Sequence, residues 1–80
     1  MTLKEIIKVE NAIFLAYSSA KFTYETSLKD YGEDHFLTTS SKEDFEHLSE
    51  AKEIIENERR EISKKYTVEE FNRILSEVEI

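Results

Sequence analysis

The stretch "TLKEIIKVENAIFLAYSSAKFTYETSLKDYG", Thr2 to Gly32, decides the fold. Its apolar residues recur mostly in steps of three and four, which marks one face of a helix: Leu3, Ile6, Ile7, Ile13, Phe14, Tyr17, Ala20, Tyr24, Leu28 and Tyr31. Thr2 and Glu5 have the spacing of a capping box, and glycine is the residue that commonly follows a helix. The pattern predicts a helix over residues 3–31, about 43 Å long at roughly 1.5 Å per residue.

The capping-box pattern occurs twice more along the chain. Ser40 or Ser41, with an acidic residue three positions later, indicates the start of a second helix over about residues 41–65. Thr67, with Glu three positions later, indicates a short third helix over about residues 68–79. A helix of this length is not stable alone, so we expect it to pack on the other helices or on a partner.

The composition favours long helices joined by few turns. The 80 residues include no proline, no cysteine and a single glycine, and these are the residue types that mark turns or form disulfides. A chain of this length forms at most one domain, so we expect one helical domain over residues 1–80. The fold prediction is all-α: a long antiparallel hairpin with residues 33–39 as the connection, plus the third helix. Phe36 and Leu37 are expected to pin that connection onto the helix ends.

An alternative fold places a β-hairpin between the helices. Residues 21–27 and 35–39 are rich in aromatic and β-branched side chains, and "KDYGED" between them resembles a turn. Against this alternative, Tyr17, Tyr24 and Tyr31 are spaced seven residues apart, which places them on one face of a continuous helix.

The charge distribution excludes several classes of function. The net charge is −7, and the whole excess lies after Gly32: residues 1–32 carry four acids and four bases, and residues 33–80 carry 14 acids and 7 bases. Direct binding to nucleic acid is not expected, because it depends on clustered Lys and Arg. The longest apolar run, Ala12 to Tyr17, is far shorter than the roughly 20 residues that span a bilayer. Glu5 and Glu10 do not fit a signal peptide, so we expect a cytoplasmic protein that does not bind membranes.

Self-association is expected from the width of the apolar band on the first helix. Val9 and Leu15 extend the band beyond the stripe that one facing helix and a short third helix can cover. An apolar patch of this kind usually marks an interface, and two-fold dimers are the commonest oligomers. The sequence therefore predicts a homodimeric helical bundle.

Two groups of side chains have the types needed for chemistry. Glu10 lies within the apolar stripe, where a buried carboxylate would have a raised pKa. The preferred interpretation is that Glu10 either extends to the edge of the stripe or pairs with a Lys or Arg of the facing helix. Asp44 and His47 lie one helical turn apart and could share a metal, but antiparallel packing separates them from Glu10. One glycine cannot form a phosphate-binding loop. We therefore expect no catalytic, cofactor or metal site, and not an enzyme.

The expected partner is another protein with a basic surface. The candidate contact residues are two tyrosines, because Tyr is enriched at half-buried interfaces, and exposed acids: Tyr24, Tyr31, Glu46, Glu50, Glu53, Glu69 and Glu70. The first hypothesis is a non-catalytic adaptor or regulator. The second is an acidic inhibitor that mimics nucleic acid, of the type that small mobile elements encode. The third is a helical metal-binding protein with carboxylate ligands.

Overall fold

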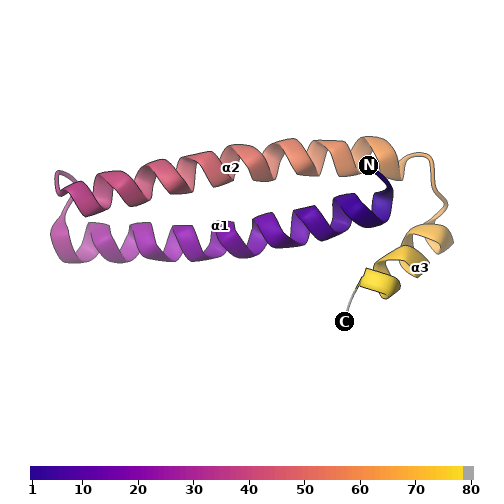
Figure 1. Cartoon of the computed structure of the whole chain (residues 1–80), viewed down its shortest axis with the longest axis horizontal. Helices are drawn as coiled ribbons and strands as arrows, with labels where there is room; N and C mark the ends of the chain where they lie inside the picture. The colour runs from indigo at the N-terminus through magenta and orange to yellow at the C-terminus, as the bar shows by residue number, and fades with distance from the viewer. Residues whose placement is uncertain (79–80) are drawn as a thin grey trace.

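The computed structural model describes residues 1–78, which form three helices and no strand (Figure 1). Helix α1 spans Leu3–Tyr31, α2 spans Phe36–Ser63 and α3 spans Val68–Val78. α1 and α2 lie antiparallel and side by side, and α3 packs near the N-terminal end of α1. The molecule is elongated, with principal extents of 48 × 23 × 16 Å. The all-α prediction of a hairpin plus a short helix is confirmed.

The predicted start of α1 is confirmed in atomic detail. The backbone N–H of Glu5 donates to Thr2 Oγ1 at 3.2 Å, and the backbone N–H of Thr2 donates to Glu5 Oε1 at 2.9 Å. At the other end, Gly32 has φ of 83° and its N–H donates to the Leu28 carbonyl at 3.0 Å. Only glycine adopts this backbone conformation without strain, so the single glycine fixes where α1 ends.

The predicted start of α2 is wrong by one and a half turns. The capping residue is His35, whose Nδ1 accepts the Leu37 N–H at 3.2 Å, and not Ser40 or Ser41. The connection is correspondingly short and comprises residues 32–35. Phe36 and Leu37 lie exposed on the first turn of α2, and Phe36 contacts the connection only by stacking on His35.

Ser41, one of the two serines predicted as a cap, bonds inside α2 instead, and nearby Thr38 bonds across to α1. Ser41 is buried, and its hydroxyl contacts the carbonyl oxygens of Leu37 at 2.8 Å and Thr38 at 3.0 Å. The Thr38 hydroxyl donates across the hairpin to the carbonyl of Ser27 at 3.1 Å. Hydroxyls satisfied by carbonyls one turn back are compatible with a helix interior, so they do not mark its start.

The β-hairpin alternative is wrong. Residues 21–27 belong to α1 and residues 36–39 to α2. The rings of Tyr17 and Tyr24 both pack on Phe45 of α2, with centroids 5.3 and 5.8 Å apart. Of the aromatic residues that suggested a strand, Tyr24 therefore forms part of the contact between the two helices, seven residues after Tyr17 as the helical spacing predicted.

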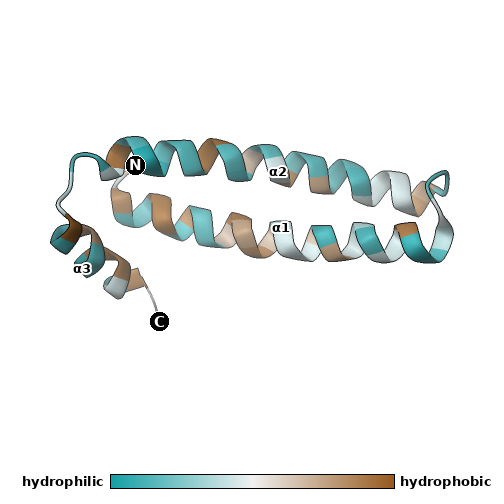
Figure 2. Ribbon diagram, turned by 180° about the vertical axis from the view of Figure 1, so that it is seen from behind, coloured by the Kyte–Doolittle hydropathy of each residue, from teal (hydrophilic) through white to brown (hydrophobic). Residues whose placement is uncertain are grey.

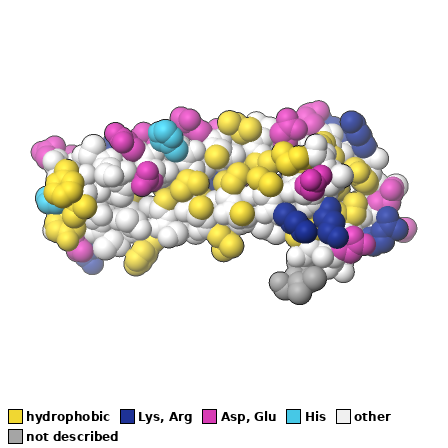
Figure 3. Space-filling view, in the orientation of Figure 1, with side chains coloured by type: hydrophobic (Ala, Val, Ile, Leu, Met, Phe, Trp, Pro, Cys, Tyr) yellow, Lys and Arg dark blue, Asp and Glu magenta, His cyan; other side chains and the backbone are white. Residues whose placement is uncertain are grey.

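The buried apolar core is small and lies mainly at the α3 end. Leu3, Ile6 and Ile7 are at most 2% exposed, and Ile55 is 6% exposed. Figure 2 shows the hydrophobic segments concentrated in the first half of α1 and in α3, whereas α2 is largely hydrophilic. Many large apolar side chains stay exposed (Figure 3): Met1, Val9, Phe14, Leu15, Phe22, Tyr31, Phe36, Leu37, Ile54 and Val68. The predicted apolar excess on α1 is present.

α3 is held at its start by a capping box and packs mainly on α1. The Glu70 N–H donates to Thr67 Oγ1 and the Thr67 N–H donates to Glu70 Oε1, both at 3.1 Å, which confirms the predicted start. Its apolar stripe is only half-buried, and comprises Phe71, Ile74, Leu75 and Val78. Lys4 of α1 and Glu77 form an ion pair at 3.7 Å. The predicted end at residue 79 lies outside the described residues.

We predict that the core at the α3 end dominates stability. Ile6→Ala removes a fully buried side chain and is expected to lower the free energy of unfolding by about 2–4 kcal/mol. Ile54→Ala is the matched control because Ile54 is 65% exposed, and its effect is expected to stay within about 0.5 kcal/mol. Urea denaturation followed by circular dichroism measures both. Equal effects would contradict the assignment of the core.

Candidate interaction surface

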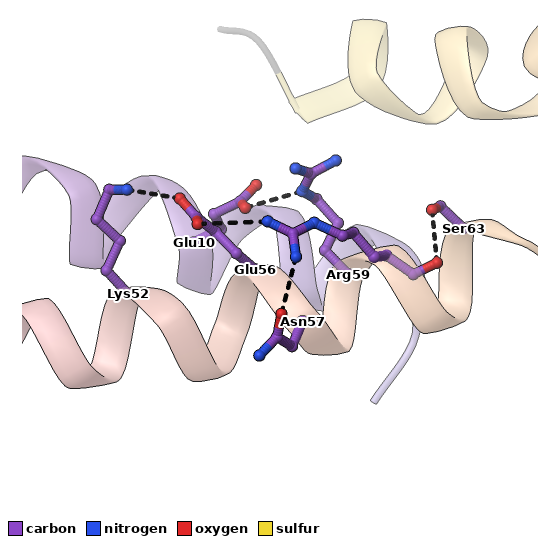
Figure 4. A network of polar contacts seen from close by, with 7 residues as sticks. Glu10, Lys52, Glu56, Asn57, Arg59 and Ser63 are labelled. Carbon is purple, nitrogen blue, oxygen red and sulfur yellow. Dashed lines mark hydrogen bonds and ion pairs between the residues drawn. The ribbon is translucent and has the colours of Figure 1, made fainter.

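Glu10, the carboxylate within the apolar stripe of α1, forms an ion pair between the two long helices. Arg59 of α2 donates from Nε to Oε2 of Glu10 at 2.8 Å, and both side chains are half-buried (Figure 4). Of the two alternatives in the preferred interpretation of Glu10, the structure shows pairing with a cation of the facing helix. The pair fixes the axial register of α1 against α2, since only one alignment brings these two side chains together.

A chain of charged groups extends from this pair along α2. Lys52 contacts Glu56 at 2.7 Å, and Arg60 contacts the same carboxylate at 3.9 Å. The hydrogen bond from Lys52 lowers the pKa of the Glu56 carboxyl, and the bond to Glu56 raises the pKa of the Lys52 amine. Lys52 also lies 5.5 Å from the centre of the Tyr17 ring, a cation–π distance. The ion pairs stay within α2, the Lys52–Tyr17 contact reaches α1, and together they leave little charge available to a partner.

The two candidate tyrosines have different environments. Tyr24 is half-buried and stacked on Phe45, so much of its ring is used inside the hairpin. Tyr31 is 54% exposed and stacks on His35 with ring centroids 4.6 Å apart. His35 in turn stacks on Phe36 at 4.8 Å. Of the two residues, Tyr31 is the one whose surface is available to a partner.

Three of the candidate glutamates share one face of α2, which we call the acidic strip: Glu46, Glu50 and Glu53. At about 100° per residue they fall within about 60° of each other, on the side away from the residues that face α1. All three are exposed. Glu46 has a long contact of 4.0 Å with Lys42, and within residues 1–78 no Lys or Arg lies within 4.0 Å of Glu50 or Glu53. The strip therefore presents charge that the protein itself does not neutralise.

Glu69 and Glu70 are not part of the acidic strip. They lie on α3, which packs on α1, whereas the strip faces away from α1. The carboxylate of Glu70 accepts the Thr67 backbone N–H, and this bond lowers the pKa of the Glu70 carboxyl. Glu69 is exposed on the first turn of α3. Of the five predicted glutamates, the structure brings three together.

The possible metal ligands of α2 border a shallow hollow between the two long helices. The hollow is lined by small residues of α1 and by four residues of α2: Ala16, Ser19, Ala20, Glu43, Asp44, His47 and Leu48. Glu10 is paired with Arg59 and does not belong to it. Across residues 1–78, no group of three or more His, Asp or Glu side chains is placed to hold a metal ion.

One exposed surface was not recognised from the sequence. Phe22 lies outside the predicted apolar stripe of α1, and Leu15 lies at the flank of that stripe. Both side chains are 71% exposed and lie on the same side of the helix. Their spacing of seven residues, on a side of α1 without charge, was the available signal.

No family model matches the chain, and neither a curated protein nor a solved structure matches it. In the part of the chain that the structure describes, no helix is long and apolar enough to cross a membrane. The function must therefore be inferred from the protein's own surfaces.

We predict that the Glu10–Arg59 pair makes a measurable contribution to stability. Arg59→Ala is expected to lower the free energy of unfolding by about 1 kcal/mol, because it leaves the half-buried Glu10 carboxylate without its partner. A double-mutant cycle with Glu10→Gln is expected to give a coupling of about 0.5–1 kcal/mol. Arg60→Ala is the control, since its side chain is mostly exposed. A coupling of zero would show that the pair is incidental.

We also predict that Glu70 makes stability sensitive to acid. Its pKa is lowered from the usual value of 4.5 in the folded state, so its contribution is present above that pH and is lost as pH falls through the folded pKa. Glu70→Gln is therefore expected to reduce the acid-dependent loss of thermal stability. Glu69→Gln, one residue earlier and outside the capping box, should leave that loss unchanged. Melting curves between about pH 3 and 7 measure both.

Proposed function

We propose that this protein is a small, non-catalytic adaptor or regulator that self-associates and binds a basic surface of another protein. The observation that carries the proposal is the acidic strip. Its three carboxylates are exposed on one helical face, and Glu50 and Glu53 have no cation of residues 1–78 within 4.0 Å. Charge that is not neutralised internally is available to attract and orient an oppositely charged partner.

The position of the strip supports this role. Most cations of α2 are already engaged, because Lys52 and Arg60 contact Glu56 and Arg59 contacts Glu10. The C-cap residue Lys64 likewise contacts Glu61 at 3.0 Å. The strip lies on the side of α2 opposite α1, away from the Glu10–Arg59 pair that joins the two helices. A partner can therefore approach it without breaking the contacts that hold the hairpin together.

The spacing of charge favours an adaptor over a nucleic-acid mimic. Along α2, residues three or four apart rise by about 5 Å, so the strip carries one charge for each such interval. Duplex DNA carries one charge for about every 1.7 Å of its axis. A strip with about a third of that linear density is a weak substitute for the phosphate backbone, so general recognition of a basic surface is the preferred function.

We predict that neutralising the strip abolishes partner binding. The triple variant Glu46→Gln, Glu50→Gln, Glu53→Gln retains exposed polar side chains and should fold normally. Immobilised wild-type protein is expected to retain a basic protein from an extract of its own cells, identified by mass spectrometry. The purified partner should then bind the triple variant at least about tenfold more weakly, and bind wild type more weakly at high salt.

The matched control neutralises three exposed acids elsewhere: Glu25→Gln, Asp44→Asn and Glu58→Gln. It changes the net charge equally, so retained binding would locate the contact on the strip. Binding that is insensitive both to the strip substitutions and to salt would refute the acidic contact. Competition between the strip and DNA for the partner would instead favour the inhibitor.

A further inference from the structure

The side of α1 that faces away from α2 carries no charge over most of its length. Between Lys8 and Lys29 the charged residues of α1 are Glu10, Lys21 and Glu25. At about 100° per residue, each lies about 60° or more around the helix from both Leu15 and Phe22. The face between them, which we call the α1 outer face, comprises exposed, uncharged residues: Asn11, Ala12, Leu15, Ser18, Ser19, Phe22 and Thr26.

Two large apolar side chains stand on this face. Leu15 and Phe22 are both 71% exposed and lie two turns apart. Figure 3 shows hydrophobic side chains projecting along the edge formed by α1, with charged side chains near its two ends. A single exposed leucine is ordinary, but this face lacks charge for about 30 Å in a chain in which 36% of residues are charged. The combination of two exposed large apolar side chains and a long uncharged face makes this surface a candidate interface.

The distribution of charge indicates that the occupant is a second copy of this chain. The net charge of −7 lies entirely after Gly32, so two copies that met through α2 would bring their acidic strips together. Two copies that meet through the α1 outer face keep both strips outside, where they remain free. The α1 outer face is thus the side on which this acidic protein can pair with itself at least electrostatic cost.

The charges at the two ends of the face indicate an antiparallel arrangement. Lys8 stands at the end nearer α3, whereas Lys29, Asp30, Glu33 and Asp34 give the loop end a net charge of −2. An antiparallel copy brings the loop end of one chain toward Lys8 of the other, whereas a parallel copy brings like ends together. α3 packs beside the first turn of α1, where Glu77 contacts Lys4, so the α1 surface from Lys8 onward remains open.

The surface area is consistent with pairing. The elongated monomer exposes 6008 Å², about 1,000 Å² more than the roughly 5,000 Å² expected of a compact monomer of 9.5 kDa. Each partner in a typical stable interface loses about 800 Å². The excess is therefore about what one interface of standard size would bury.

We infer that two copies of this protein pair antiparallel through their α1 outer faces, with Leu15 and Phe22 at the centre. This inference rests on one part of the proposed function, self-association, and assigns that part to a specific surface. It does not depend on the acidic strip. The dimer would carry its two strips on opposite sides, and would therefore be bivalent toward basic partners.

The first test is the mass in solution by sedimentation equilibrium. Wild type is expected to sediment at about 19 kDa at concentrations near 100 µM, and Leu15→Glu, Phe22→Glu at the monomer mass of 9.5 kDa. Ile54→Glu is the matched control, because Ile54 is 65% exposed on α2, and it should remain dimeric. Wild type at 9.5 kDa would overturn self-association and this interface together. A dimer that survives Leu15→Glu, Phe22→Glu would overturn the interface alone.

The second test does not depend on disrupting the interface. The chain has no cysteine, so single cysteines can be introduced without background. In the antiparallel arrangement Ser19 lies near the two-fold axis, and oxidation of Ser19→Cys is expected to give a disulfide-linked dimer. Ala12→Cys should stay unlinked, since the two copies of residue 12 lie about 20 Å apart. Efficient linking at residue 12, or none at residue 19, would overturn the antiparallel pairing.

Discussion

Burial of the first turns of α1 is the interaction on which the rest of the structure depends. Leu3, Ile6 and Ile7 are three of the four buried apolar side chains among the described residues. Each such burial contributes about 1.5–3 kcal/mol, a large part of what an 80-residue chain can gain. α3 packs at this end and the N-terminus of α1 is capped there, so one small cluster positions all three helices.

The outer surfaces of the two long helices differ in charge. α1 presents a surface without charge, and α2 presents carboxylates in excess of its free cations. Arg59 is the exception that joins them, because it crosses the seam to reach Glu10 at 2.8 Å. This difference leaves two surfaces on opposite sides of one hairpin, so occupation of one does not obstruct the other.

Features that depend on local chemistry were predictable from the sequence, whereas features that depend on tertiary contacts were not. The capping boxes at Thr2 and Thr67 and the helical period could be predicted, because each depends on residues within one or two turns. The start of α2 could not be predicted, because a serine or threonine hydroxyl can either cap a helix or donate to a carbonyl. In the structure Thr38 and Ser41 donate to carbonyls. The acidic strip could be predicted from the sequence, because steps of four and three residues place its glutamates on one helical face. The structural role of Tyr24 was not predictable, because a ring stacked inside the hairpin looks the same in a sequence as a free one.

The side chains packed between α1 and α2 differ in type from one end of the hairpin to the other. Near α3 they are aliphatic, and toward the loop they form stacked rings and hydroxyl contacts such as that between Thr38 and Ser27. Hydroxyl contacts gain less from burial than aliphatic side chains do, so resistance to local opening is graded along the rod. Backbone amides beside Gly32 should exchange their hydrogens through partial unzipping, whereas those around Ile6 should exchange only when the whole chain unfolds. The hairpin is therefore expected to resist local opening at the α3 end and to open more readily at the loop end.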